Sequence, residues 1–353
     1  MKRVRMTRTH TALSIRARLG RTIGDGIGRS NDASSVLRAA ELTHKDAVSG
    51  YVWGVLHTIK SYFCKGILVS HILMLGANGV YAAESSPNRS RTYVPVEACQ
   101  ISAHSVIVTT RLGRSCIRYA ASSGVQGAAV AIISFHGDRD PQSEVKKDFK
   151  AVEIERIKDA QQFADRYRQP WIMIARPGVY GSSGDHWARR ELLEFLTIDA
   201  AISAIKARYG IKHLVLVGHS GGATAVGALL TLGREDILCA VMTSGAFSLL
   251  ERQARRSAAT GRNYTNAERD YDPLTHIPGI RRSNNRKIYI AGDPRDSNTH
   301  FDLQQLFADK VRLAGHEVEV VRLKGVPPAY HNIGTEGLKL AADCARERAS
   351  QIQ

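Results

Sequence analysis

The sequence lacks the residue patterns that hold a metal ion. It has five cysteines, but no CxxC pair and no Cys/His cluster with the spacing of zinc ligands. It also lacks zinc-finger spacing, the aromatic motif of RNA-binding domains and a helix-turn-helix signature. We therefore expect no metal ion or other cofactor and no nucleic-acid partner. The sequence indicates no oligomeric state.

Acidic residues are scarce beside basic ones, and the imbalance is uneven along the chain. The 353 residues carry 49 Lys and Arg against 33 Asp and Glu, a formal net charge of +16. Residues 1–83 hold 12 basic and 4 acidic residues, so the first quarter of the chain carries half of the excess. We interpret this as a basic leader in front of a domain with a mildly basic surface.

Long apolar runs are also missing near the N-terminus. The most apolar run there, 66–75, is shorter than the roughly 20 residues that a transmembrane helix needs. It follows Lys60 and Lys65 and precedes the small residues of 76–83. A basic flank, a short apolar run and a small-residue site are typical of a secretory signal peptide, which we place at 60–83.

Cleavage of this signal would follow Val80-x-Ala82 or Tyr81-x-Ala83. The segment starts some 60 residues into the chain. Either translation begins near Val52, or the segment is an anchor or a core helix. We favour export, which predicts a periplasmic or secreted protein without stable membrane insertion of the mature chain. A cytoplasmic protein is the alternative.

Four cysteines remain after loss of Cys64 with the leader, and an even number is compatible with disulfides in an oxidising compartment. Cys99 and Cys116 flank a predicted strand, and we predict a disulfide between them. Cys239 lies inside an apolar strand, where the alternative is a small buried hydrophobic residue. Cys344 is the fourth cysteine.

From about residue 100, strand-like apolar runs alternate with helical patterns, which favours a mostly parallel sheet with helices on both faces. We assign 84–353 to one α/β domain. The expected strands are 104–110, 115–120, 128–135, 171–175, 213–217, 237–243, 286–291 and 317–323. The expected helices are 145–168, 191–209, 221–232, 301–314 and 334–348.

Residues 246–285 break this alternation, because they are rich in arginine and have no clean period. Two interpretations stay open for the segment. It is either a small cap over the functional site or a solvated surface excursion.

The chemistry centres on Gly218-His219-Ser220-Gly221-Gly222, where an apolar strand meets a predicted helix. This is the Gly-x-Ser-x-Gly pattern of a nucleophile elbow. Side chains at Gly218 and Gly222 would collide with neighbouring backbone, and the tight turn strains Ser220. We expect Ser220 to be the nucleophile and the Gly221 amide, at a helix N-terminus, to donate to an oxyanion.

A serine nucleophile needs a base, and the base needs an orienting carboxylate. In Gly-x-Ser-x-Gly enzymes the chain order is Ser, Asp, His. An apolar strand ending at Gly292 runs into a turn with two aspartates, Asp293 and Asp296. We choose Asp296, because the turn lets the later residue reach inward; Asp293 is the fallback and is expected to stabilise the turn.

The base is expected in the loop after the last strand, 324–334, where His331 precedes the final helix. His300 opens a helix and His316 precedes a strand, so neither is placed on that loop. We therefore choose His331.

A second oxyanion donor is expected after an earlier strand. Phe135-His136-Gly137-Asp138 ends such a strand, and Gly137 permits close backbone approach. We choose the amide of Asp138, which acts together with Gly221.

Together these motifs resemble the α/β-hydrolase superfamily, in particular its prolyl-oligopeptidase-like and dienelactone-hydrolase-like branches. The resemblance spans about 105–349 and implies an eight-stranded sheet and a charge-relay serine mechanism without metal. The matching segments are Phe135-His136-Gly137, 176–184, Gly218-His219-Ser220-Gly221-Gly222, Gly292-Asp293-Pro294-Arg295-Asp296 and His331.

We therefore expect a serine hydrolase that cleaves an ester through Ser220, Asp296 and His331. The expected substrate is a small ester or a short peptide, and the arginines of 252–286 suggest an anionic acyl group. One alternative is a prolyl-oligopeptidase-like serine peptidase. Another is a non-catalytic binding protein on the same fold, because a fold does not fix a function.

Overall fold

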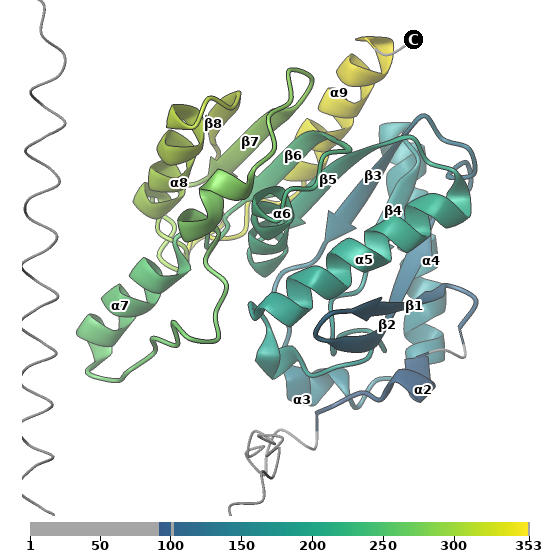
Figure 1. Ribbon diagram of the computed structural model, residues 1–353, viewed down its shortest axis with the longest axis horizontal. Coiled ribbons are helices and arrows are strands. Elements are labelled where there is room, and N and C mark those ends of the chain that lie inside the picture. Colours follow the sequence, from purple (N-terminus) through teal and green to yellow (C-terminus); the bar gives the residue numbers. More distant parts are fainter. Residues whose placement is uncertain (1–91, 100–101, 352–353) are drawn as a thin grey trace, which may run out of the picture. The chain divides into compact units, whose positions relative to one another are not determined.

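Eight strands form one mixed sheet in the described part of the chain, in the order β1-β2-β4-β3-β5-β6-β7-β8 (Figure 1). The computed structural model describes residues 92–99 and 102–351, so the predicted leader, the signal peptide at 60–83 and Cys64 lie outside the described residues. The strands are β1 (Ser105–Thr110), β2 (Gly113–Ala121), β3 (Val130–Phe135), β4 (Trp171–Ile174), β5 (His213–His219), β6 (Ile237–Thr243), β7 (Lys287–Gly292) and β8 (Val318–Arg322).

Most of the sheet is parallel, as expected. β1 and β2 form an antiparallel hairpin and β2 pairs antiparallel with β4. The remaining neighbours, from β4 through β3 and β5 to β8, all pair in parallel. Parallel pairing brings the carboxyl ends of β3, β5, β7 and β8 to one edge, where α/β sheets bind their ligands.

The inner strands are apolar on both sides because both faces of the sheet are covered. Every residue of β3 and of β6 is buried. A parallel strand between two layers of helices reads as a continuous hydrophobic run rather than as an alternation. The edge strand β8 is only partly buried.

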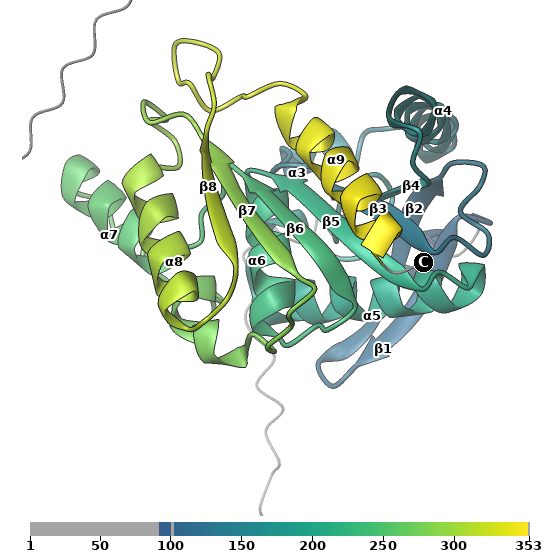
Figure 2. The ribbon, with the colours of Figure 1, turned by 90° about the horizontal axis from the view of Figure 1, so that it is seen from above.

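Five helices cover the two faces. α5, α6 and α8 pack around a core that includes Phe195, Leu229 and Phe307. α4 and α9 cover the opposite face around Tyr167 and Ala341, and Figure 2 shows α9 and α6 on opposite sides of the strands. The bounds are α4 (Phe149–Tyr167), α5 (Leu192–Tyr209), α6 (Gly221–Thr231), α8 (Phe301–Leu313) and α9 (Glu336–Gln351). Within residues 92–99 and 102–351, we find no helix with the length and hydropathy needed to cross a bilayer.

The helix expected at 145–168 begins later than predicted, at Phe149, because capping aspartates start two separate helices in this part of the chain. Asp140 accepts hydrogen bonds from two following amides and starts the short helix α3 (Pro141–Glu144). Asp148 does the same for α4. Such caps satisfy amides that have no partner inside the helix, and so they fix where each helix begins.

Residues 246–285 lie between β6 and β7 and contain α7 (Leu249–Thr260) and the 3₁₀ helix η2 (Pro273–Gly279). Within α7 only Leu249 is fully buried. Arg252 of this helix nevertheless lines the pocket described below. One side chain of the segment therefore faces the pocket, while most of α7 is exposed to solvent.

Two disulfides join the four cysteines of the described domain. The predicted Cys99–Cys116 bond is confirmed, with a Cα–Cα distance of 5.8 Å. Cys239 of β6 is bonded to Cys344 of α9, with Cα atoms 6.4 Å apart. The interpretation of Cys239 as a plain buried hydrophobic residue is therefore wrong. The sequence gives no sign of this pair, because its members are 105 residues apart.

Candidate active site

The serine of the Gly-x-Ser-x-Gly motif sits on a sharp turn between β5 and α6. Ser220 has φ 55° and ψ −121°, a strained conformation for a residue with a side chain. A Cβ on Gly218 would lie 2.6 Å from the amide nitrogen of Ala223, and a Cβ on Gly222 would lie 2.6 Å from the carbonyl oxygen of His136. The two glycines are thus required by close backbone approach.

Asp296 and His331 are brought together at the same edge of the sheet. The Nδ1 atom of His331 lies 2.8 Å from Oδ2 of Asp296. The other carboxylate oxygen, Oδ1, accepts hydrogen bonds from the amides of Asn298 at 2.8 Å and Thr299 at 3.0 Å. Thr299 Oγ1 lies 2.9 Å from Oδ2 and also 2.9 Å from the carbonyl oxygen of Ser244, so its single proton serves two acceptors. The carboxylate is therefore held from both sides.

These hydrogen bonds decide the charge of Asp296. Burial by itself would raise the pKa of the carboxyl, but the hydrogen bonds from His331 and from the amides of Thr299 and Asn298 hold it below its usual value. Asp296 is then ionised at neutral pH and accepts the Nδ1 proton of His331. This fixes the tautomer whose Nε2 carries a free lone pair.

Asp293, the fallback acid, has other partners. Its Oδ1 accepts a hydrogen bond from the amide of Arg295 at 2.8 Å, and its Oδ2 accepts one from the amide of Gly325 at 2.7 Å. The Arg295 guanidinium also pairs with it at 2.8 Å. Asp293 thus ties its own turn to the loop after β8, and the structure pairs Asp296 with His331 instead.

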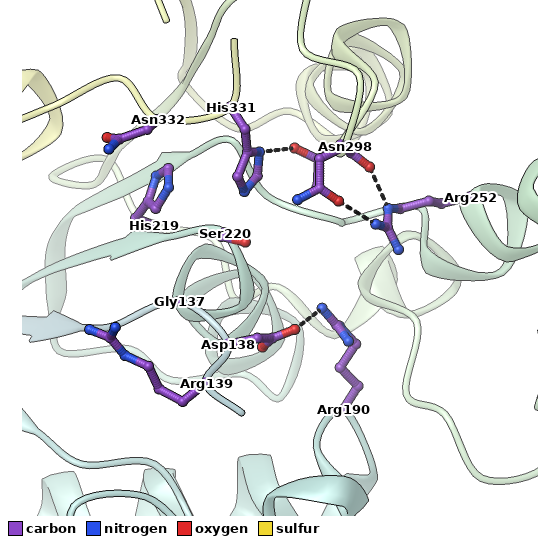
Figure 3. A pocket seen from close by; sticks show the side chains of 11 residues that line it. Gly137, Asp138, Arg139, Arg190, His219, Ser220, Arg252, Asn298, His331 and Asn332 are labelled. Carbon is purple, nitrogen blue, oxygen red and sulfur yellow. Dashed lines mark hydrogen bonds and ion pairs between the residues drawn. The ribbon is translucent and has the colours of Figure 1, made fainter. Parts of the chain in front are cut away.

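Ser220 and His331 line one pocket of about 470 Å³, which Figure 3 shows from close by. In the part of the chain that the structure describes, no hydrogen bond joins the side chains of Ser220 and His331. Hydrogen bonds of this kind are often long without substrate and tighten in the complex. The residues that line the pocket are Gly137, Asp138, Arg139, Arg190, His219, Ser220, Arg252, Asn298, Thr299, His331 and Asn332.

The loop after β3 approaches the serine closely. A Cβ on Gly137 would lie 3.3 Å from Cβ of Ser220. The carbonyl oxygen of Gly137 lies 2.7 Å from Nδ1 of His136, and Nε2 of His136 accepts a hydrogen bond from the Arg176 amide at 3.2 Å. His136 Nδ1 is therefore the donor to Gly137.

This hydrogen bond also fixes the direction of the Asp138 amide. In a trans peptide the C=O and the N–H point in opposite directions, and the Gly137 carbonyl and the Asp138 amide belong to one peptide. Burial, followed by the charge of Arg176, lowers the pKa of His136 well below its usual value, so the ring stays neutral. In the described part of the chain, the amides of Asp138 and Gly221 donate to no protein acceptor.

The side chain of Asp138 is held in an ionic cluster that the sequence analysis missed. Arg176, fully buried, bonds to Oδ1 of Asp138 at 2.8 Å and to the buried Glu194 at 2.7 Å. Arg190 Nη2 reaches Oδ2 at 2.5 Å, and Arg189 lies 3.3 Å from it. The cluster fixes the loop that carries the Asp138 amide.

The charges of this cluster keep Asp138 ionised. Burial alone would raise the pKa of the carboxyl, but Arg190 and Arg176 outweigh burial and hold the pKa far below its usual value. Asp138 is therefore a fixed anion rather than an acid or a base. The sequence signal for the cluster is Arg176, which comes two residues after the end of β4 and opens the segment 176–184 quoted above.

His219 also lines the pocket, and the sequence analysis assigned it no role. Its ring centroid lies 5.1 Å from that of His331. Thr243 Oγ1 donates to the carbonyl of Gly218 at 3.0 Å and so accepts from Nδ1 of His219 at 3.1 Å. Burial, followed by the charge of His331, lowers the pKa of His219 to about 4, so it is neutral at physiological pH.

The fold and this edge of the sheet define a class of protein. An eight-stranded, mostly parallel sheet in this order carries a serine on a strand–turn–helix elbow, followed in the chain by an aspartate and a histidine on later loops. This is the α/β-hydrolase fold, and the fold expected from the sequence is confirmed. Among the described residues no group of three or more His, Cys, Asp and Glu side chains is placed to hold a metal ion.

No family model matches the sequence, and no curated protein matches it. Among solved structures, the chain is similar to the esterase Pf2001 of Pyrococcus furiosus, with 15% identity, a TM-score of 0.47 and coverage of 70% of this chain and 91% of that one. Est1E from Butyrivibrio proteoclasticus is 10% identical, with a TM-score of 0.45 and coverage of 70% and 98%. The acylaminoacyl peptidase of Pyrococcus horikoshii is 12% identical, with a TM-score of 0.45; the match covers 70% of this chain and 41% of the peptidase.

Proposed function

We propose that this protein is a serine hydrolase that cleaves a carboxylic ester through an acyl-enzyme intermediate. The observation that supports this most is the 2.8 Å hydrogen bond between Asp296 and His331 in a pocket that Ser220 also lines. In serine hydrolases a carboxylate orients a histidine, and the histidine acts as the base for a serine on a nucleophile elbow. This arrangement activates the serine hydroxyl for attack on an acyl carbon.

Each residue has a separate role in the proposed reaction. Ser220 Oγ attacks the acyl carbon while Nε2 of His331 takes its proton, and Asp296 stabilises the imidazolium that forms. His331 then gives this proton to the leaving alcohol, and the acyl group stays on Ser220. In the second half of the reaction His331 activates a water molecule, which releases the carboxylic acid and restores Ser220.

The oxyanion of each tetrahedral intermediate is assigned to the amides of Asp138 and Gly221. Both donors are backbone groups, and donors of this kind act most strongly when they are already aimed before the reaction. The hydrogen bond from His136 to the Gly137 carbonyl supports this role for Asp138, because it sets the orientation of the shared peptide. The Gly221 amide opens α6, where the helix dipole favours negative charge.

An ester is the preferred substrate because an alcohol leaves with less activation than an amine. The test is labelling with a fluorophosphonate probe, followed by turnover of p-nitrophenyl esters and aminoacyl-p-nitroanilides. We expect wild-type protein to be labelled and to turn over the esters, and Ser220→Ala to lose the label.

A matched control is Ser297→Ala, an exposed serine on the loop that carries Asp296. It should keep the label and the turnover. An unlabelled wild-type protein would instead favour a non-catalytic binding protein, and selective turnover of the anilides would favour a peptidase.

We also propose that the protein is exported and that its mature chain begins near Ala83 or Glu84. The basic–apolar–small pattern of 60–83 supports this, and so do two disulfides in one domain, since disulfides persist mainly in oxidising compartments. N-terminal sequencing of protein from its native host should find Ala83 or Glu84 first. A soluble cytosolic protein that retains Met1 would contradict the proposal.

A further inference from the structure

Positive charge is in excess around the pocket. Five guanidinium groups lie in it or in the adjoining ionic cluster, against three carboxylates. The arginines are Arg139, Arg176, Arg189, Arg190 and Arg252, and the carboxylates are Asp138, Glu194 and Asp296. With the histidines left out of the count, two positive charges are left uncompensated.

Arg252 carries the clearest part of this excess. Its Nε donates to the carbonyl oxygen of Asn298 at 2.8 Å and its Nη2 donates to Oδ1 of the same residue at 2.6 Å. Both acceptors are neutral, and no described carboxylate forms an ion pair with Arg252. Its Nη1 makes no hydrogen bond to the described chain, so it is free to bind a ligand.

The surroundings of Arg252 disfavour its charge. Burial, followed by the charges of Arg190 and Arg256, lowers its pKa. A guanidinium that is partly removed from water and feels the charge of other guanidinium groups is stabilised by a nearby anion. Figure 3 shows Arg252 and Arg190 reaching the pocket from two sides, both to the same side of Ser220.

Arg190 is fixed as firmly as Arg252. Its amide donates to Oε2 of Glu194, its carbonyl accepts from the amide of Tyr271 at 2.8 Å, and its guanidinium bonds to Asp138. Arg252 is fixed by Asn298 at two points. The two cations therefore need little ordering to bind an anion, which keeps the entropic cost of binding low.

The position of Arg190 and Arg252 in the pocket bears on which part of the ester, the acyl chain or the alcohol, carries the anion. The leaving alcohol must face His331, which protonates it. Arg190 lies beside Asp138, on the side of the pocket assigned to the oxyanion. Arg252, in turn, is bonded to Asn298, two residues from Asp296, so the two arginines lie on both sides of the place where the acyl carbon is expected. We assign the group between them to the acyl chain, because this part of the substrate stays on Ser220 through both halves of the proposed reaction.

We propose that Arg252 and Arg190 bind a carboxylate on the acyl chain, so that the preferred substrate is a monoester of a dicarboxylic acid. This inference rests on the proposed serine hydrolase function. Guanidinium groups suit a carboxylate because their N–H groups match its two oxygens, and the charge strengthens each hydrogen bond.

The test compares two esters of equal acyl length, mono-p-nitrophenyl adipate and p-nitrophenyl hexanoate. The measured quantity is the ratio of kcat/KM for the adipate to kcat/KM for the hexanoate. We expect a ratio well above one for the wild type, and a fall of about 10- to 100-fold in Arg252→Gln. At about 1.4 kcal/mol for each factor of ten, this fall corresponds to about 1.4–2.8 kcal/mol, the size expected for hydrogen bonds with a charged group.

A ratio is used because Arg252 also holds Asn298, whose amide bonds to Asp296. Any disturbance of Asp296 lowers turnover of both esters and cancels in the ratio. Arg252→Glu should bring the ratio below one, and Arg252→Lys should give an intermediate value. If Arg252→Gln does not fold, Arg252→Lys and the loss of the wild-type preference at high salt serve in its place.

Arg255 provides the matched control on the same helix. It pairs with Glu251 and Asp302, is 41% exposed in its side chain and does not line the pocket. Arg255→Gln should leave the ratio at the wild-type value. A further pair of butyrate esters, with and without a carboxylate on the nitrophenol, tests the alcohol side.

The outcomes separate this inference from the proposed function. Turnover of both esters with a ratio near one, an unchanged ratio in Arg252→Gln, or a preference only for a carboxylate on the alcohol overturns the inference and leaves the serine hydrolase standing. If the fluorophosphonate does not label Ser220 and neither ester is cleaved, the proposed function fails, and this inference fails with it.

Discussion

Replacing Ser220 with alanine is expected to lower kcat on any accepted ester by about 10⁶-fold, the loss seen when a serine-hydrolase triad loses its nucleophile. Ser220→Ala removes the atom that we propose forms the acyl-enzyme but leaves the amides of Asp138 and Gly221 in place. His331→Ala should cost about as much, because without the base the Ser220 hydroxyl stays protonated.

The double variant Ser220→Ala/His331→Ala tests whether the two side chains act as one unit. If Ser220 and His331 act as one unit, Ser220→Ala/His331→Ala should be no slower than either single variant. Steady-state turnover of p-nitrophenyl esters measures all three, with Ser297→Ala as the control. Losses that multiply in the double variant would show that the two side chains act independently, and a Ser220→Ala protein with more than a few per cent of activity would place the nucleophile elsewhere.

Asp296→Asn is expected to lower kcat by about 10²- to 10⁴-fold while the fold is kept. Oδ1 of Asp296 accepts two backbone amides, so the amide oxygen of the asparagine must take this position. Its NH₂ group then faces Nδ1 of His331 and donates to it. This favours the wrong tautomer, with a proton on Nε2, and such a ring cannot accept the proton of Ser220.

Asp293→Asn is the matched control, a nearly isosteric change three residues away. Asp293 bonds to Arg295 and to the Gly325 amide rather than to His331, so we expect a much smaller effect on kcat. Turnover of one accepted ester decides between the two aspartates. If Asp293→Asn abolishes activity and Asp296→Asn leaves it near normal, the orienting acid is Asp293.

The fold was predictable because its signals are local. β-branched and apolar runs alternate with helical periods, and a strand followed by Gly-x-Ser-x-Gly predicts a turn with strained backbone. The structure has that turn at Ser220, with φ 55°. The boundaries were less certain, since capping aspartates such as Asp148 moved a helix start by a few residues.

The placement of Asp296 beside His331 also followed from local rules. Both residues come after parallel strands, and parallel strands bring such loops to one edge of the sheet. The sequence analysis selected Asp296 over Asp293 from the room that the Gly292 turn allows, and the hydrogen bonds agree with that geometry. The roles of Ser220, Asp296 and His331 in catalysis stay predictions.

Other features were beyond sequence reasoning because they depend on partners far apart in the chain. Arg176 and Asp138 are 38 residues apart, and Arg252 and Asn298 are 46 apart. Ion pairs and disulfides between distant elements leave no periodic trace. For the same reason Arg252 was only one of several arginines in 246–285 until the structure showed which of them faces the pocket.

The Cys239–Cys344 disulfide has a consequence for how the domain opens. A C-terminal helix is ordinarily among the first elements to fray. Here α9 is covalently bonded to the central strand β6, while β8, on the other side of the His331 loop, pairs with β7. Partial opening from the C-terminus therefore stops at Cys344, and the part of α9 between the His331 loop and Cys344 stays anchored to the sheet. The α9 amides up to Cys344 should then exchange with solvent much more slowly than the amides that follow Cys344.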